Sequence, residues 1–179
     1  MKRTVSELSA NDIDPIINYF LQADHAFLHT MGVDPQKLPN GDDWRNRLLE
    51  DLNRPIPERQ YYYLMWELDD RPVGHSNINK IIFGTEAYMH LHLWELSIRQ
   101  SGHGAHFIRS SIDRYFETFN LQTLLCEPYR LNPAPNKTLA KIGFELIKTY
   151  ETTPGWINFQ QTVNRWALTR EKWLQMPTS

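Results

Sequence analysis

Histidine and asparagine side chains alternate with apolar ones along two neighbouring segments of the sequence. His75, Asn77 and Asn79 follow one another at intervals of two residues, and His90 and His92 repeat this spacing. Because alternate side chains of a strand point to the same face, each set would share one face of a sheet. A turn near 83–86 would pair the two strands as a hairpin and bring both sets together. Histidine titrates near neutral pH, so such a cluster could accept a proton or orient a water molecule that does so.

This histidine–asparagine cluster predicts the acceptor side of an active site, with His90 or His92 as the base. Unpaired polar groups are costly on a fully buried face, which favours a site over a core position. Solvent-facing or purely structural histidines are the alternative. Glu95, at the end of the same strand, is a rival base. The His-x-His pair and a third histidine could also ligate zinc, but no cysteine or close carboxylate completes a ligand set, and we expect no metal.

A second pattern, Arg-Gln-Ser-Gly-His-Gly at 99–104, separates an expected strand from an expected helix. Two glycines allow the backbone to turn sharply and to approach a ligand closely. Amide groups in the first turn of the helix would then point at a phosphate, and the helix dipole favours negative charge there. A dinucleotide-binding fingerprint would need a third glycine at the position of Phe107, so that interpretation fails. An ordinary strand-to-helix turn is the alternative to a pyrophosphate site.

The elements that must position these patterns follow in the order strand, two helices, three-stranded meander, helix, strand, helix and two strands. The expected strands cover 4–8, 61–68, 73–83, 87–96, 121–127, 144–152 and 159–169, and the expected helices start near 13, 42, 105 and 135. This order predicts a single α/β (α+β) domain spanning 1–179. Its central sheet would be mixed, mostly antiparallel and flanked by about four helices.

Length and composition agree with one globular domain, because the chain has 179 residues, of which 41% are hydrophobic and 22% charged. A formal net charge of -2, with Lys and Arg scattered, argues against a nucleic-acid partner. The longest apolar run, 61–66, is too short to cross a bilayer, so no membrane partner is expected. A single cysteine, Cys126, and a polar N-terminal segment predict a cytoplasmic protein. Cys126 itself is expected to be a buried apolar residue and not a nucleophile.

Two motifs together resemble a known superfamily. Arg-x-x-Gly-x-Gly at 99–104 is similar to the pyrophosphate loop of the GNAT superfamily of N-acetyltransferases. Asn-Pro-Ala-Pro-Asn-Lys-Thr-Leu-Ala-Lys-Ile-Gly-Phe at 132–144 resembles a helix of the RimJ/RimL-like branch, which acetylates ribosomal proteins. Both motifs stand in the order and at the spacing of the family. The resemblance implies the GNAT fold, acetyl-CoA as co-substrate, and transfer of the acetyl group to a primary amine by direct attack.

The same resemblance implies how acetyl-CoA would be held. The backbone of the glycine-containing loop would bind the pyrophosphate, Arg99 would add charge, and Asn132 would contact the cofactor arm. The end of the strand that precedes the loop would pair with the pantetheine, and one of its amide groups would polarise the thioester carbonyl. The cofactor-binding residues implied in this way are Trp94, Leu96, Arg99, Gln100, Ser101, Gly102, His103, Gly104, Ala105 and Asn132.

The sequence departs from the family pattern at three positions. His103 stands where Lys or Arg is usual, and Pro135 where Ser or Ala is common. Leu139 occupies the position at which many relatives carry a tyrosine that protonates the departing thiolate. Since that general acid is missing, a non-catalytic acyl-CoA-binding module that acts as a sensor or scaffold is the alternative function. A zinc-dependent hydrolase is a third.

The acceptor is expected to be a small polar amine, an amino-acid-like metabolite or a protein N-terminus. His75, Asn77 and Asn79 would contact it, together with His29 and Trp156 from segments that are expected to border the acceptor side. The polar wall favours a small polar acceptor over a peptide. The sequence leaves the oligomeric state open, including a homodimer.

Overall fold

The computed structural model of the chain describes residues 1–95, 98 and 102–176. These residues form a seven-stranded sheet with the order β1-β2-β3-β4-β5-β7-β6. Of the neighbouring strands, β4 and β5 are parallel and the other pairs are antiparallel. The strands are β1 (Arg3–Glu7), β2 (Tyr61–Leu68), β3 (Arg71–Ile82), β4 (Glu86–Leu93), β5 (Thr123–Cys126), β6 (Glu145–Thr152) and β7 (Gln161–Thr169). The predicted mixed, mostly antiparallel sheet is thus confirmed.

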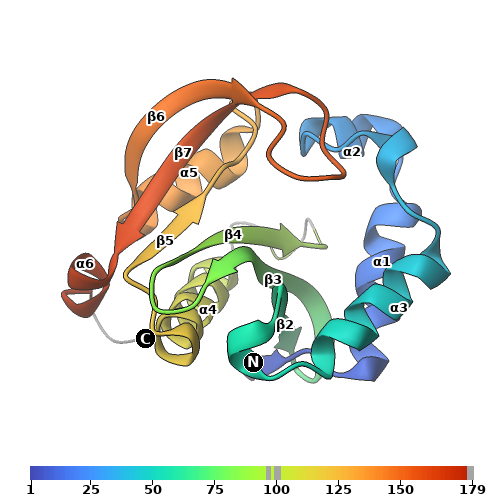
Figure 1. Cartoon of the computed structure of the whole chain (residues 1–179), viewed down its shortest axis with the longest axis horizontal. Helices are drawn as coiled ribbons and strands as arrows, with labels where there is room; N and C mark the ends of the chain where they lie inside the picture. The colour runs from blue at the N-terminus through green and yellow to red at the C-terminus, as the bar shows by residue number, and fades with distance from the viewer. Residues whose placement is uncertain (96–97, 99–101, 177–179) are drawn as a thin grey trace.

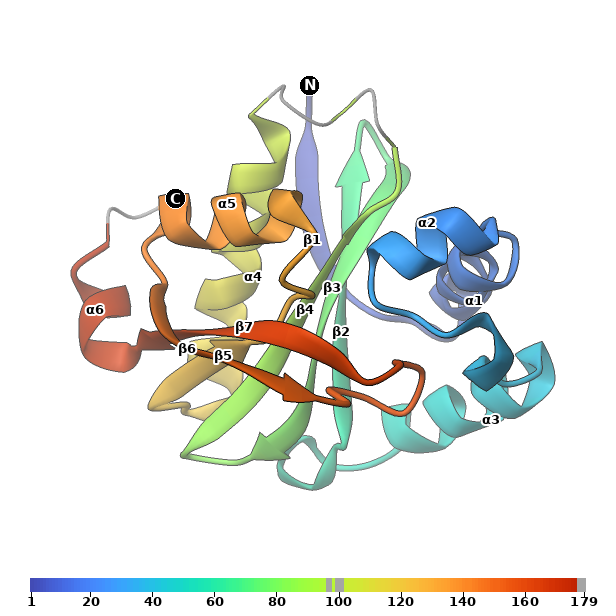
Figure 2. The same cartoon turned by 90° about the horizontal axis from the view of Figure 1, so that it is seen from above.

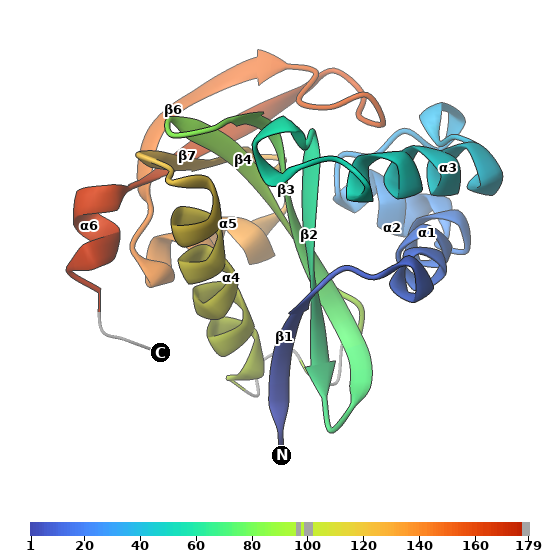
Figure 3. The same ribbon diagram turned by 60° about the horizontal axis from the view of Figure 1, so that its bottom comes forward.

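Helices cover both faces of the sheet. They are α1 (Ile13–Leu21), α2 (His25–Thr30), α3 (Gly41–Leu52), α4 (His103–Phe119), α5 (Pro133–Ile142) and α6 (Arg170–Leu174), with 3-10 turns at Ala10–Asp12, Pro35–Lys37 and Ile56–Glu58. Helices α1, α2 and α3 lie on one side of β2, β3 and β4, and α4 and α5 lie on the other (Figures 1 and 3). Helix α2 and the terminal α6 are absent from the sequence-based expectation. No helix among the described residues is long and apolar enough to cross a bilayer.

The main core lies between the sheet and α4. The apolar stripe of α4 is buried, as its spacing predicts. Trp66 on β2 stacks on Phe107, with 5.6 Å between ring centroids, and its indole N–H donates to Ser111 Oγ at 2.9 Å. On the side of β3 and β4 that faces α4, the Tyr115 hydroxyl donates to Ser76 Oγ at 2.8 Å, and Ser76 Oγ donates to the His90 carbonyl at 2.9 Å. These bonds satisfy the buried polar groups and fix β3 and β4 against α4.

A second core cluster holds α1 and α3 against the opposite face of the sheet. Ile13, Ile16 and Ile17 of α1 are buried there with Trp44 of α3 and Met65 of β2. Helix α3 starts earlier than expected, because the Asn40 side chain accepts a hydrogen bond from the Asp43 amide at 2.8 Å and so caps the helix. This cluster brings the N-terminal helices over the sheet face that carries the predicted histidines.

Strands β4 and β5 separate after a short paired region. They pair over three positions only, from Glu86 opposite Thr123 to Tyr88 opposite Leu125. Beyond this point β4 continues to Leu93, and the two strands diverge (Figure 1). Backbone groups along the diverging edge of β4 therefore have no neighbouring strand on that side.

The loop between β6 and β7 is fastened to the segment after α2 (Figure 2). The Gly32 carbonyl accepts hydrogen bonds from Asn158 Nδ2 and Gln161 Nε2, both at 2.8 Å, and the Asp34 amide donates to the Ile157 carbonyl at 2.8 Å. Gly32 has φ +76, and a Cβ there would lie 2.2 Å from Gln161 Oε1, so a larger residue would be strained and would displace the Gln161 side chain. We call these contacts between 32–37 and 155–161 the clasp. It fixes one wall of the cavity described next.

Candidate active site

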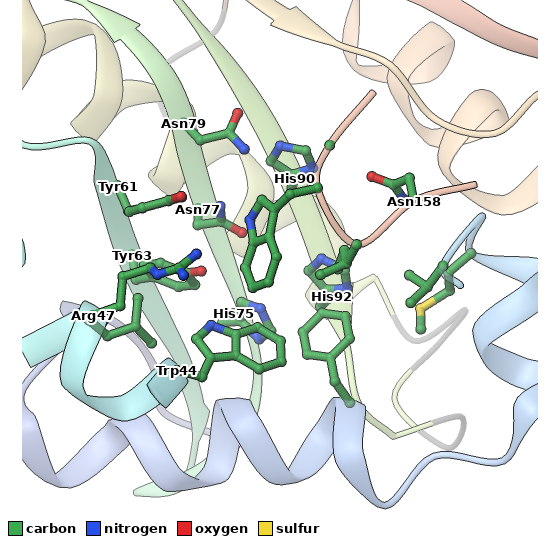
Figure 4. Close-up of a pocket in the computed structure, with 17 residues that line it drawn as sticks. Trp44, Arg47, Tyr61, Tyr63, His75, Asn77, Asn79, His90, His92 and Asn158 are labelled. Carbon is green, nitrogen blue, oxygen red and sulfur yellow. The ribbon is translucent and has the colours of Figure 1, made fainter. Parts of the chain in front are cut away.

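The hairpin of β3 and β4 brings the predicted histidine–asparagine cluster together. His75 lies opposite His92, Asn77 opposite His90, and Asn79 opposite Tyr88. All five cluster residues line a cavity of about 110 Å³ on the face covered by α1 and α3 (Figure 4). The expected hairpin register is therefore confirmed, and the cluster faces a cavity and not bulk solvent. Such a volume has room for several water molecules or for a small organic molecule in their place.

Aromatic and apolar side chains form the remaining walls of the cavity. The additional lining residues are Phe20, Met31, Val33, Trp44, Arg47, Leu48, Tyr61, Tyr63, Gly155, Trp156, Ile157 and Asn158. Trp156, which was predicted to border the acceptor side, is one of these lining residues. Sequence reasoning missed Tyr61 and Tyr63, although their alternation with buried neighbours along β2 was a signal that they share a face. It also did not identify Trp44 and Arg47 of α3 as cavity residues.

The position of the proton on His75 follows from its neighbour Trp94. The indole Nε1 of Trp94 lies 3.0 Å from His75 Nδ1. An indole N–H can only donate, so His75 Nδ1 must be an unprotonated acceptor, and the neutral ring carries its hydrogen on Nε2. His75 also stacks on His92, with 4.6 Å between ring centroids. Burial lowers the pKa of His75 well below its ordinary value, and the nearby His92 and His90 rings lower it further.

His90 and His92 are also held neutral. Burial lowers the pKa of His90 to about 4, with Lys80 lowering it further and Glu127 raising it. Burial, with a smaller contribution from His90, lowers the pKa of His92 to about 3. Both rings border the cavity, but His90 Nε2 and His92 Nδ1 are shielded from solvent and have no hydrogen-bond partner in the described part of the chain, as is true of Asn79 Oδ1. A buried polar atom without a partner is costly, so these atoms favour a partner that the described residues do not supply.

We expect the three histidines to make the fold less stable below about pH 6.5. In the unfolded chain they take up protons near pH 6.5. In the folded protein His90 and His92 stay neutral down to about pH 4 and 3, so below pH 6.5 the unfolded state binds more protons. Each histidine then lowers the free energy of unfolding by up to about 1.4 kcal/mol per pH unit. Chemical unfolding at several pH values between 7.5 and 5.0 measures this slope, which is the change in the free energy of unfolding per pH unit. A His90→Asn variant should show roughly two thirds of it, and an unchanged slope would contradict the assignment.

Glu127 is a buried carboxylate beside His90 that sequence reasoning missed. Its side chain is 5% exposed and accepts hydrogen bonds from Arg165 Nε at 2.6 Å and from the Tyr150 hydroxyl. Arg165 also donates to the Tyr88 hydroxyl at 3.1 Å. The network joins β4, β6 and β7 close to the point where β4 and β5 separate. A carboxylate directly after the buried run of β5 was the available signal, since an acidic residue there must be paired.

Two predicted acceptor-side residues lie outside the cavity lining. Glu95 forms an ion pair with Arg71, with Nη2 and Oε2 at 3.1 Å. His29 is exposed on α2, where its ring stacks on Phe159 with 4.9 Å between centroids. The structure therefore separates Glu95 and His29 from the histidine–asparagine cluster.

The described part of the predicted cofactor loop is open on its ligand side. Of the implied cofactor residues, Leu96, Arg99, Gln100 and Ser101 lie outside the described residues. Gly102 has φ +80, a conformation that favours glycine, and α4 begins at His103 with no acidic residue in its first turn. Across the described part of the chain, a Cβ on Gly102 or Gly104 would meet no atom within 4 Å. His103 Nδ1 is buried and has no partner among the described residues. This loop fits an anionic group at the start of a 17-residue helix.

The structure also describes two other implied cofactor residues, Trp94 and Asn132, as well as Leu139 and Cys126. The Trp94 amide donates to the Val73 carbonyl at 2.9 Å, so it is already used in the sheet and cannot polarise a thioester as expected. Asn132 caps α5 through its backbone, and its side chain makes no capping hydrogen bond. Leu139 is fully buried in the main core, and Cys126 is buried with the pKa of its thiol raised to about 12. Cys126 is therefore the buried, unreactive residue that was expected.

A zinc site has no support in the described residues. Across 1–95, 98 and 102–176, no three His, Cys, Asp or Glu side chains are grouped so that they could hold a metal ion. The stacked rings of His75 and His92 and the hydrogen bond from Trp94 account for the histidine arrangement without one.

The architecture matches that of solved N-acetyltransferases. Spermidine N-acetyltransferase from Vibrio cholerae, solved with CoA and spermine, is 16% identical over 96% of this chain and 98% of its own, with a TM-score of 0.78. RimL, a ribosomal L7/L12 alpha-N-protein acetyltransferase solved with CoA, is 15% identical over 96% of each chain, with a TM-score of 0.76. No protein-family model matches the sequence, and no curated protein matches it significantly.

At these identities the similarity establishes the fold. The chain has the fold of the GNAT N-acetyltransferases, and RimL is one of the solved proteins that share this fold. The fold expectation drawn from the two sequence motifs is therefore confirmed.

Proposed function

We propose that this protein transfers the acetyl group of acetyl-CoA to a primary amine by direct attack, without a covalent enzyme intermediate. The observation that carries the proposal is the cavity lined by His75, His90 and His92, which lies next to the separated strands β4 and β5. Solved proteins of the same fold are N-acetyltransferases, and two of them were solved with CoA. Fold alone does not determine function, so the residues must support the chemistry.

The residues at the start of α4 fit the phosphate groups of acetyl-CoA. Gly102 and Gly104 leave the ligand side open, and the first amide groups of α4 have no acceptor within the helix. The buried, unpartnered His103 Nδ1 provides a further polar contact. Asn132 at the start of α5 would contact the remaining part of the cofactor. Acetyl-CoA supplies an activated acetyl thioester, and the chain supplies orientation, exclusion of water and a route for the proton.

His90 is the best candidate to handle the proton of the attacking amine. It is the first cluster residue on β4 after the last pair with β5, and its Nε2 atom is unpartnered. With its pKa lowered to about 4, the neutral imidazole accepts a hydrogen bond at physiological pH but holds a proton weakly. We infer that His90 orients the amine or a water molecule that carries the proton away. His75, Asn77 and Asn79 would position the acceptor beside it.

One observation favours an acyl-CoA-binding module without turnover as the second candidate. Leu139 is fully buried in the core at the position where many GNAT enzymes carry a tyrosine that protonates the thiolate. Such a module would bind acetyl-CoA through the same loop and would gain nothing from the histidine–asparagine cluster.

Calorimetric titration with acetyl-CoA, followed by an assay of CoA release, tests both candidates. The proposed enzyme binds acetyl-CoA with one-to-one stoichiometry and releases CoA only when an amine acceptor is added. Saturable binding without release across a broad panel of primary amines would identify the binding module instead. No binding at millimolar acetyl-CoA would overturn both.

A further inference from the structure

The charges around the cavity indicate what kind of amine it accepts. Arg47 on α3 is the charged residue of the cavity lining (Figure 4). Its guanidinium lies 4.8 Å from the centroid of the Trp156 ring. Among the described residues, no carboxylate forms an ion pair with Arg47. Glu50 and Asp51 lie near Arg47 on α3, but neither is ion-paired with it among the described residues. An exposed guanidinium without an ion-pair partner, at the mouth of an aromatic cavity, is a suitable partner for an anionic ligand group.

Carboxylates near the cavity are already engaged by the chain. Asp51 accepts hydrogen bonds from the amides of Gln60 and Tyr61, both at 2.9 Å. Glu50 binds Arg54 at 2.8 Å, and Glu127 forms the ion pair with Arg165. None of these carboxylates lines the cavity. The residues outside the described part include no Asp or Glu, so they add none.

Two lysines add positive charge at the rim. Lys37 Nζ donates to the Asn158 carbonyl at 2.7 Å, and Lys80 Nζ donates to the Pro154 carbonyl at 2.8 Å. Both carbonyls belong to the loop that borders the cavity, and carbonyl partners do not neutralise an ammonium group. A polyammonium ligand would meet these charges without a carboxylate to offset them, and like charges in a partly buried site repel strongly. The Trp156 ring, which could bind a cation through its face, already carries Arg47.

We propose that the acceptor is an amino acid with an apolar side chain, or a closely related amino carboxylate, and that Arg47 binds its carboxylate. This inference rests on the proposed acetyl transfer and names its substrate class. The apolar side chain would contact the aromatic wall formed by Phe20, Trp44 and Tyr63. The amino group would lie against the wall of the cavity that His90 and His92 form. The assignment separates this protein from the polyamine acceptor named for its structural neighbour from Vibrio cholerae.

The test compares each amino acid with its amide, which lacks the carboxylate, and adds spermidine and a peptide as the two other classes of acceptor. CoA release is measured at saturating acetyl-CoA with L-phenylalanine, L-leucine, their amides, spermidine and a tetrapeptide amide, and rates are expressed per concentration of unprotonated amine. We expect kcat/KM for each amino acid to exceed that for its amide by about 10- to 100-fold, the effect of one charge-assisted hydrogen bond. The Arg47→Gln variant should lose this preference through a higher KM for the amino acids.

Arg45→Gln is the matched control, because Arg45 lies on the same helix but forms an ion pair with exposed Asp14 outside the cavity. It should keep the preference for the carboxylate. If spermidine or the peptide is the best acceptor, or if Arg47→Gln keeps the preference, this inference is wrong while acetyl transfer stands. If acetyl-CoA binds and no amine releases CoA, the proposed function itself is wrong and the inference falls with it.

Discussion

Replacement of His90 by alanine is expected to reduce turnover by about 10²- to 10⁴-fold, the range typical of a lost acid–base group. Acetyl-CoA affinity should not change, because His90 lies in the acceptor cavity and not in the loop before α4. His92→Ala should also lower turnover, since the His92 ring packs against His75 in the same cavity. Steady-state CoA release and calorimetry with acetyl-CoA separate the two effects.

The pH dependence of kcat/KM in the wild-type protein is an independent test of the role proposed for His90. Because the pKa of His90 is lowered to about 4, log kcat/KM should rise with pH up to the pKa of the acceptor amine and show no inflection near pH 6.5. His25→Ala, on the exposed face of α2, serves as a control variant with unchanged turnover. If His90→Ala and His92→Ala both keep full activity, the base lies elsewhere. Glu127 is then the next residue to test, ahead of Glu95, which is paired with Arg71 outside the cavity lining.

Gly104→Val is expected to weaken acetyl-CoA binding by at least about tenfold, which corresponds to roughly 1.4 kcal/mol. A Cβ at this position meets no atom of the described residues within 4 Å, so we expect the branched side chain to fit the unliganded protein and to project into the space that a ligand would occupy. The midpoint of thermal unfolding should therefore stay close to that of the wild type. Calorimetric titration with acetyl-CoA measures the loss.

Gly104→Ala provides the graded comparison, because one methyl group fills less of the same space. Its acetyl-CoA affinity should fall between those of the wild type and Gly104→Val. Equal affinity in all three proteins would show that the start of α4 does not hold the cofactor. A large drop in thermal stability, in contrast, would show that the substitution acts on the fold.

The histidine–asparagine cluster could be predicted because its residues are close in sequence and share one hairpin. Side chains alternate in a strand, and a short turn limits the register to few choices, so the pairing of Asn77 with His90 follows from local rules. The same holds for α4, whose apolar residues recur at helical spacing. The GNAT fold then followed from two motifs in order, without any knowledge of the tertiary contacts.

Apart from Trp156, the remainder of the cavity was not predicted, because it depends on contacts between distant segments. Arg47 and Trp44 come from α3, and nothing in their local sequence indicates which sheet face the helix covers. Helix α2 has only six residues and depends on an Asp24 cap and on the clasp, so its apolar spacing is too short to recognise. Trp94 illustrates the same limit, because the hydrogen bond of its amide with Val73 depends on how far β3 and β4 remain paired.

The clasp also bears on how the protein folds. It joins residues more than 120 positions apart, since Gly32 bonds with Asn158 and Gln161. Closing so long a segment of chain is entropically costly, and contacts of high sequence separation form late. The meander of β2, β3 and β4 can assemble from local pairs, whereas the cavity wall is complete only when both ends of the chain have folded. Acceptor binding would therefore be coupled to the last step of folding, and a ligand in the cavity would protect the whole domain against unfolding.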